Sequence, residues 1–196
     1  MSETLRAFVA IDLPRVAVEA LAAVQGAVDR YGLSIRWVRP ENLHLTLKFL
    51  GDIPADVVGA VAHAMVRAVG DAAPLHLTVG GLGVFPGINR PRVLWAGLYG
   101  DTRRLEALHG HLNRALADVG FAPDIKPFRA HLTLGRPRDR IDARGLADAM
   151  THAGTYVPIG LPVEAIALFK SRLTPAGPVY TRLRTAVLAG AERHGP

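Results

Sequence analysis

The sequence contains no cysteine among its 196 residues. Disulfide bonds, thiolate nucleophiles and sulfur-ligated metal sites are therefore excluded, and any metal ion would need histidine, aspartate or glutamate ligands. The chain also lacks a run of about 18 uninterrupted apolar residues, which a membrane-spanning helix requires. Its first residues, Met1 to Arg6, have no apolar stretch of the kind that signal peptides carry. We therefore expect a soluble, cytoplasmic protein with no membrane partner.

Lysine is also scarce, with only three residues, yet the net charge is +6 and the isoelectric point is near 10.3 because arginine is abundant. The planar guanidinium group forms bidentate hydrogen bonds with phosphate oxygens, so this composition is compatible with nucleic-acid or nucleotide partners. A solvated basic surface that binds nothing explains the same composition.

The tetrapeptide His-Leu-Thr-Leu is present twice, once beginning at His44 and once at His131, and each copy has a proline four residues before its histidine. Both copies lie in apolar, β-prone segments. Because side chains alternate between the two faces of a strand, His44 shares a face with Thr46, and His131 shares a face with Thr133. A reaction that needs one proton acceptor, one proton donor and a held anion would use such imidazole and hydroxyl pairs.

Hydrophobic periodicity predicts alternating strands and helices. The predicted strands cover Leu5 to Asp12, Ile35 to Val38, His44 to Leu50, Leu75 to Leu82, Arg92 to Leu98, the second His-Leu-Thr-Leu segment, Val163 to Lys170 and Val179 to Val187. The predicted helices cover Val16 to Tyr31, Ala55 to Val69, Thr102 to Val119 and Ala143 to Ala153. In the first helix, Val16, Ala20, Val24 and Val28 have the spacing of one apolar face. Residues 189–196 are expected to form a loose tail.

These elements predict an α+β protein, residues 1–196 forming one bilobal domain. Each of two pseudo-symmetric lobes would be a mostly antiparallel sheet with helices on its outer face, and a cleft would separate the inner faces. A doubly wound parallel sheet is the rival, but the chain has no Walker pattern. Its glycines at Gly80, Gly81 and Gly83 do not complete a dinucleotide-binding fingerprint.

A third His-x-Thr begins at His76. Its proline, Pro74, is only two residues ahead, its fourth residue is Val79, and it falls in the same half of the sequence as His44. We expect His76 to be a surface strand residue whose replacement leaves activity largely intact.

The chain resembles the 2H phosphoesterase superfamily and, within it, the RNA 2',3'-cyclic phosphodiesterases, which are also known as bacterial 2'-5' RNA ligases. The paired His-x-Thr motifs define the superfamily, and Ala130 stands where the family commonly has proline. The matching stretches span nearly the whole chain: Leu5 to Ile11, Trp37 to Gly51, Phe85 to Trp95, Phe128 to Arg136 and Leu168 to Leu183.

This resemblance implies opening of a 2',3'-cyclic phosphate to a 2'-phosphomonoester without a metal ion or another cofactor. It implies that His44 is the proton donor, that His131 is the proton acceptor, and that Thr46 and Thr133 hold the phosphate. Substrates would be RNA ends, such as tRNA fragments, or nucleotides, with reversible 2'-5' ligation as a second activity and a monomer as the working form. The residues alone do not decide which histidine donates, because the two copies are nearly identical.

Three cations are candidate substrate contacts. In a regular strand, Lys48 would lie on the same face as His44 and Arg129 on the same face as His131, because each pair is separated by an even number of residues. Arg136 lies off that face unless Gly135 bends the strand, which glycine permits.

The remaining candidates are assigned to structural roles. Phe85, Phe128 and Tyr180 are expected to be core residues, although an aromatic ring can also stack on a base. His109 and His111 are two residues apart on a helix, so they cannot bind one ion together, and we expect both to face solvent.

Two other classes of function remain open. A metal-dependent hydrolase would be inhibited by chelation, although the sequence has no compact cluster of histidines and carboxylates. An RNA-binding module without turnover would bind RNA in a salt-dependent way and leave the cyclic phosphate intact.

Overall fold

The computed structural model describes residues 3–70, 72–175 and 177–189, and these contain two antiparallel sheets. Sheet A has the strand order β3-β1-β8-β9. Its strands are β1 (Thr4–Asp12), β3 (His44–Pro54), β8 (Ala165–Thr174) and β9 (Gly177–Val187). Sheet B has the order β2-β6-β5-β4-β7. Its strands are β2 (Ile35–Trp37), β4 (Leu75–Phe85), β5 (Val93–Gly100), β6 (Leu132–Pro137) and β7 (Ile159–Val163).

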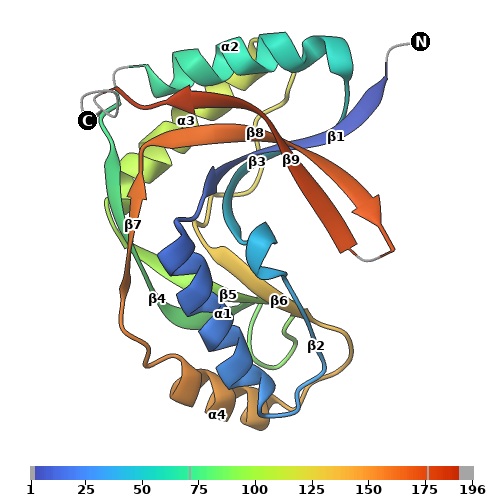
Figure 1. Ribbon diagram of the computed structural model, residues 1–196, viewed down its shortest axis with the longest axis vertical. Helices are drawn as coiled ribbons and strands as arrows, with labels where there is room; N and C mark the ends of the chain where they lie inside the picture. The colour runs from blue at the N-terminus through green and yellow to red at the C-terminus, as the bar shows by residue number, and fades with distance from the viewer. Residues whose placement is uncertain (1–2, 71, 176, 190–196) are drawn as a thin grey trace.

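Two helices accompany each sheet. Helices α2 (Val58–Val69) and α3 (Thr102–Ala117) lie at the sheet A end of the molecule, and α1 (Arg15–Asp29) and α4 (Ala143–Ala153) lie at the sheet B end (Figure 1). Two short 3-10 helices, η1 (Pro40–Asn42) and η2 (Ala55–Val57), precede β3 and α2 respectively. The predicted α+β architecture of two antiparallel sheets with helices is confirmed.

Strand alternation sorts the side chains between core and cleft. In β3, Leu45 and Leu47 are buried while His44 and Thr46 are partly exposed, and in β6 the same holds for Leu132 and Leu134 around Thr133. One cluster of buried apolar residues runs through both sheets and all four helices. Because this core fixes the leucines, it also fixes the face on which the polar residues between them emerge.

The lobes are not the two halves of the sequence. Sheet A combines the first and third strands of the chain with its last two, whereas the other five strands form sheet B. One argument against His76 was therefore wrong, since its strand β4 lies in the same sheet as the strand that follows His131. The expected surface position is nevertheless confirmed, because His76 is exposed near the start of β4, about 30 Å along the strand from Phe85.

Two local predictions were wrong, and a third is untested. The predicted strand from Val163 to Lys170 is the end of β7 and the start of β8, and Glu164 breaks the pairing between them. In α1 the buried stripe is Ala17, Leu21, Val24 and Val28, while Val16 is 63% exposed. The helical spacing was predicted correctly, but the buried face begins with Ala17 and Leu21, one position after the predicted Val16 and Ala20. The predicted tail lies, from residue 190 on, outside the described residues.

Candidate active site

Three residues of the two His-x-Thr motifs line one cavity. β3 of sheet A and β6 of sheet B contact each other, and a cavity of about 550 Å³ is lined by His44, Thr46, Thr133 and Arg136. His131 is not among the lining residues, and it immediately precedes β6, two residues before Thr133. The cavity therefore receives hydroxyl groups from both copies of the tetrapeptide.

Both histidines are anchored in the same way. The Nδ1 atom of His44 lies 2.7 Å from the carbonyl oxygen of Asn42, and Nδ1 of His131 lies 2.6 Å from the carbonyl oxygen of Arg129. Because a carbonyl oxygen only accepts, each Nδ1 must carry a proton and donate it. Nε2 is therefore the atom that exchanges a proton, accepting one in the neutral ring and donating one in the cation.

An aromatic ring meets each imidazole edge-on. Tyr180 contacts His44 with ring centroids 5.4 Å apart, and Phe85 contacts His131 at 5.1 Å. Both interplanar angles are close to perpendicular, at 86° and 89°. Tyr180 packs against the buried cluster of Phe8, Ala10, Ala167 and Phe169, as expected of a core residue. Tyr180 and Phe85 are nevertheless partly exposed, and each also contacts a histidine ring.

Burial and nearby charges act on His44. Burial lowers the pKa of His44, while the hydrogen bond to the Asn42 carbonyl and the nearby carboxylate of Asp12 oppose that shift. Asp12 is itself ion-paired with Arg182. The pKa of Tyr180 is raised by burial, against the opposing effect of Arg136 and Arg6. The phenol of Tyr180 therefore stays protonated and can donate a hydrogen bond.

A β-bulge follows each threonine. In the pairing of β1 with β3, Ala10 pairs with Thr46 and Val9 with Lys48, which leaves Leu47 as the extra residue. In the pairing of β5 with β6, Trp95 pairs with Thr133 and Leu94 with Gly135, which leaves Leu134 as the extra residue. After a bulge of this kind, a residue that alternation would place on the cleft face lies on the core face, and the reverse.

The two bulges determine which face of the strand Arg136 and Lys48 occupy. Arg136 is returned to the cleft face and lines the cavity, as the sequence allowed if the strand bends at that point. Lys48 is turned away from it, and the prediction that it shares the face of His44 and Thr46 was wrong. Phe49 takes that place at the cavity wall and is 68% exposed.

Lys48 instead anchors the segment that leads to His131. Its side chain is only 3% exposed, and Nζ donates to Asn113 Oδ1 and to the carbonyl oxygen of Ala122, both at 2.7 Å. It also lies 3.1 Å from a carboxylate oxygen of Asp124. Ala122 and Asp124 belong to the connection between α3 and β6, so a residue of the His44 strand holds the approach to the second motif.

His109 belongs to the same network, and its predicted solvent exposure was wrong. Its ring stacks on Phe128 with centroids 4.0 Å apart and lies beside Asn113 and Asp124. Burial is the main reason that its pKa is lowered. Sequence patterns gave no signal for this contact, because Phe128 is 19 positions away and in a loop. His111 is exposed, as expected.

Arg129 lies beside the second histidine. Its guanidinium group sits 5.9 Å from the centre of the Phe85 ring, the ring that contacts His131. Its side chain is exposed, and a cation in that position favours an anionic ligand near His131.

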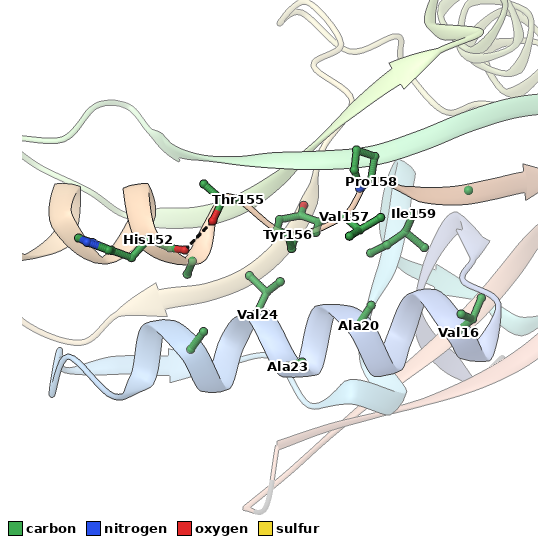
Figure 2. Close-up of a pocket in the computed structure, with 13 residues that line it drawn as sticks. Val16, Ala20, Ala23, Val24, His152, Thr155, Tyr156, Val157, Pro158 and Ile159 are labelled. Atoms are coloured by element: carbon green, nitrogen blue, oxygen red, sulfur yellow. Dashed lines mark hydrogen bonds between the residues drawn. The ribbon is translucent and has the colours of Figure 1, made fainter.

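A separate groove of about 620 Å³ lies between α1 and the segment after α4 (Figure 2). Alanine and valine side chains of α1, including Val16, Ala20 and Val24, face Tyr156 and Ile159 across it. His152 lies at one end, and its only titratable neighbour on the lining is Tyr156, whose pKa is raised to about 12 by burial. The groove lacks a matched acid and base, so we place the reaction in the cavity between the sheets.

The described part of the chain offers neither a metal-binding cluster nor a membrane-spanning helix. Within residues 3–70, 72–175 and 177–189, His, Asp and Glu side chains form no group of three or more that could hold a metal ion. None of the helices in that part of the chain is both long and apolar enough to cross a membrane.

Comparison with known proteins identifies the fold and its relatives. An RNA 2',3'-cyclic phosphodiesterase of Aquifex aeolicus is 32% identical over 96% of this chain and 100% of its own length. Another of that name, from Thermus thermophilus, is 33% identical over 97% of this chain and 93% of its own.

Solved structures agree. The crystal structure of TT0787 of Thermus thermophilus superposes with a TM-score of 0.76, at 30% identity over 95% of this chain and 99% of the other. That of E. coli LigT complexed with 3'-AMP gives 0.73 at 27% identity, with the same coverage. The sequence model of LigT-like phosphoesterases matches residues 11–95 and 100–180, which include both His-x-Thr motifs. The chain therefore belongs to the LigT-like phosphoesterase family.

Proposed function

We propose that this protein hydrolyses 2',3'-cyclic phosphates at RNA ends or on nucleotides to 2'-phosphomonoesters, with two histidines as acid and base. The observation that carries the proposal is the pair of matched sites: each histidine donates from Nδ1 to a carbonyl oxygen two residues earlier, and each threonine lines the shared cavity. The names of the relatives in Aquifex aeolicus and Thermus thermophilus support the same substrate class.

The reaction needs one proton to be removed and one to be supplied. Nε2 of His131 takes a proton from water, whose oxygen attacks phosphorus. The bond from phosphorus to the 3' oxygen breaks, and Nε2 of His44 protonates that oxygen as it leaves. The 2' oxygen keeps the phosphate, and exchange with solvent restores both rings. No metal ion or other cofactor takes part.

The division of roles between the histidines comes from the family resemblance, and the surroundings of His44 are compatible with it. Burial lowers the pKa of His44, and Asp12 opposes that shift by favouring the protonated ring, the form that a donor requires. The hydroxyl groups of Thr46 and Thr133 donate to the non-bridging phosphate oxygens. Arg136, Arg6, Arg36 and Arg39 line the same cavity and balance the phosphate charge.

Ligation is the same ring opening with a ribose 5' hydroxyl in place of water as the nucleophile, so the same groups would serve 2'-5' RNA joining. The resemblance extends the substrates to tRNA fragments. A monomeric, cytoplasmic enzyme remains our expectation.

The arginine-lined cavity also favours a second candidate, an RNA-binding module without turnover. Such a protein would bind RNA with an affinity that falls steeply as salt is added, and it would leave the cyclic phosphate unchanged.

One experiment separates the candidates. Purified protein is incubated with a 2',3'-cyclic nucleotide in the presence of a chelator, and phosphorus NMR locates the phosphate of the product. We expect a 2'-phosphate, and a fall of roughly 10² to 10⁴-fold in rate for His44→Ala and for His131→Ala. His76→Ala, the third His-x-Thr, is the matched control and should keep its activity. A 3'-phosphate product, no product, or activity abolished by chelation would contradict the proposal.

A further inference from the structure

A second basic cavity lies beside the first. It has a volume of about 440 Å³ and is lined by Arg90, Arg92, Arg140 and Asp139, together with Asn89, Pro91 and Ile141. Volumes of this size are typical of ligand sites. The three arginines come from two loops, one between β4 and β5 and one between β6 and α4, that lie near each other at the end of sheet B (Figure 1).

The arginines of this cavity are available to a ligand. All three are exposed, and among the described residues no carboxylate forms an ion pair with Arg90, Arg92 or Arg140. Asp139, the one acidic residue of the lining, accepts a hydrogen bond from Ser34 Oγ at 3.2 Å. Three guanidinium groups and one carboxylate leave the lining with a positive charge.

The loops that carry these arginines are held by the backbone. Arg92 donates from its backbone N–H to the carbonyl oxygen of Phe85 at 2.7 Å, and Arg138 donates in the same way to Ser34 at 2.9 Å. Asp142 caps the start of α4 by accepting from the backbone of Arg144 and Gly145. The backbone that carries these arginines is therefore held in place, which lowers the entropy cost of ordering the loops around an anion.

The second cavity continues the path of the first. Arg36 and Arg136, which line the first cavity, are direct partners in the pairing of β2 with β6. Asp139 and Arg140 follow Arg136 by three and four residues, so their Cα atoms lie at most about 10 and 13 Å from that of Arg136. On the other side, the loop with Arg90 and Arg92 begins at Phe85, the residue that contacts His131.

We propose that this second cavity binds backbone phosphates of the RNA strand whose cyclic 3' end occupies the first. The inference rests on the function proposed above and specifies its substrate as an oligonucleotide. A strand that ends in a cyclic phosphate continues only in the 5' direction, so the phosphates in the second cavity are those upstream of the reacting nucleotide. At about 3.4 Å per nucleotide, a separation of up to about 10 Å is spanned by no more than about three stacked nucleotides. Guanidinium groups that contact phosphates make no contact with bases, so the increase in RNA affinity does not depend on the RNA sequence.

The test compares a 2',3'-cyclic mononucleotide with cyclic-ended oligonucleotides of two, four and six residues. For the unmodified protein we expect kcat/KM to rise about tenfold between one and four residues and then to level off. Arg92→Gln/Arg140→Gln should abolish most of that rise and keep the mononucleotide rate. The slope of log kcat/KM against log salt for the longer substrates should become shallower by about 0.7 for each phosphate that the variant no longer binds.

The matched control is Arg15→Gln/Arg103→Gln, which removes the same charge from exposed positions on α1 and α3. It should preserve the dependence on length. The inference alone is overturned if oligonucleotides are no better than the mononucleotide, if both double variants reduce the rise equally, or if Arg92→Gln/Arg140→Gln slows the mononucleotide as much as the longer substrates. If neither substrate is hydrolysed, the proposed function fails together with it.

Discussion

Replacing Lys48 with methionine tests the most deeply buried charge near the cleft. Methionine fills a similar volume but makes none of the three polar contacts of the ammonium group. The carboxylate of Asp124 is 43% exposed and regains water when its partner is removed. Asn113 is only 8% exposed, and its Oδ1 is deprived of a donor at 2.7 Å, as is the carbonyl oxygen of Ala122.

The expected loss of stability follows mainly from Asn113 Oδ1, because Ala122 is exposed and its carbonyl oxygen can regain water. A buried polar group without its partner costs about 1–3 kcal/mol, whereas a partly exposed ion pair contributes less than about 1 kcal/mol. We therefore expect Lys48→Met to lower the free energy of unfolding by about 2 kcal/mol. For a chain of this length the corresponding fall in Tm is about 4–8 °C.

Urea unfolding with linear extrapolation measures the change, and an unaltered slope would show that the unfolded state is the same. Lys170→Met is the matched control, because Lys170 pairs with Glu3 at 3.0 Å on the surface and its replacement should cost less than about 0.5 kcal/mol. Asp124→Asn should cost less than about 1 kcal/mol. If Lys48→Met is no more harmful than Lys170→Met, the buried network does not stabilise the protein and the reasoning fails.

Two further predictions concern the histidines and their surroundings. If His44 is the proton donor, activity falls as pH rises through its pKa. The carboxylate of Asp12 raises the pKa of His44, so Asp12→Asn should move the alkaline limb of the kcat/KM profile to lower pH. Arg182→Gln removes the ion-pair partner of Asp12 and should move the same limb to higher pH, and limbs that do not move in opposite directions would contradict the assignment. Gly83→Ala should lower stability by about 1–3 kcal/mol, because a Cβ atom there would lie 2.1 Å from the Trp95 ring that neighbours His131. Gly160→Ala on β7, where nothing lies within 4 Å, should leave the Tm unchanged or slightly higher, and equal effects of the two variants in a thermal melt would refute the steric argument.

The sequence predicted the parts of the fold that depend on local periodicity. The strands around His44 and His131 and all four helices are where the spacing of apolar residues places them, because burial of one face imposes a period of two or 3.6 residues. The division of strands between sheets was not predicted, since pairing β1 with β8 depends on contacts between residues more than 150 positions apart. Local pattern carries no information about such partners.

The candidate site was predictable as far as the strands stay regular. His44, Thr46 and Thr133 line one cavity, as the alternation of side chains along a strand predicts. That alternation predicts the correct strand face only for residues that precede the bulge. Lys48 and Phe49 exchange their expected faces because Leu47 is inserted into the ladder without a partner. No residue type in Leu-Lys-Phe marks a bulge, so the error follows from backbone geometry and not from composition. In the second copy, Gly135 indicated that the strand can bend, because glycine tolerates the conformation that brings Arg136 to the cleft.

The bulges also explain how two nearly identical strings build an asymmetric site. The copies read His-Leu-Thr-Leu-Lys-Phe and His-Leu-Thr-Leu-Gly-Arg, and the extra residue falls at the second leucine in both. The position that returns to the cavity is then the sixth, which is Phe49 on one side and Arg136 on the other. The sixth residue is therefore apolar in one copy and cationic in the other, although the histidines and threonines are matched. A nucleotide has the same division, a base with an apolar face and a phosphate with negative charge, so we expect the two sixth residues to help orient the substrate in the cavity. Exchanging them in Phe49→Arg/Arg136→Phe would reverse that polarity while leaving both His-x-Thr motifs in place.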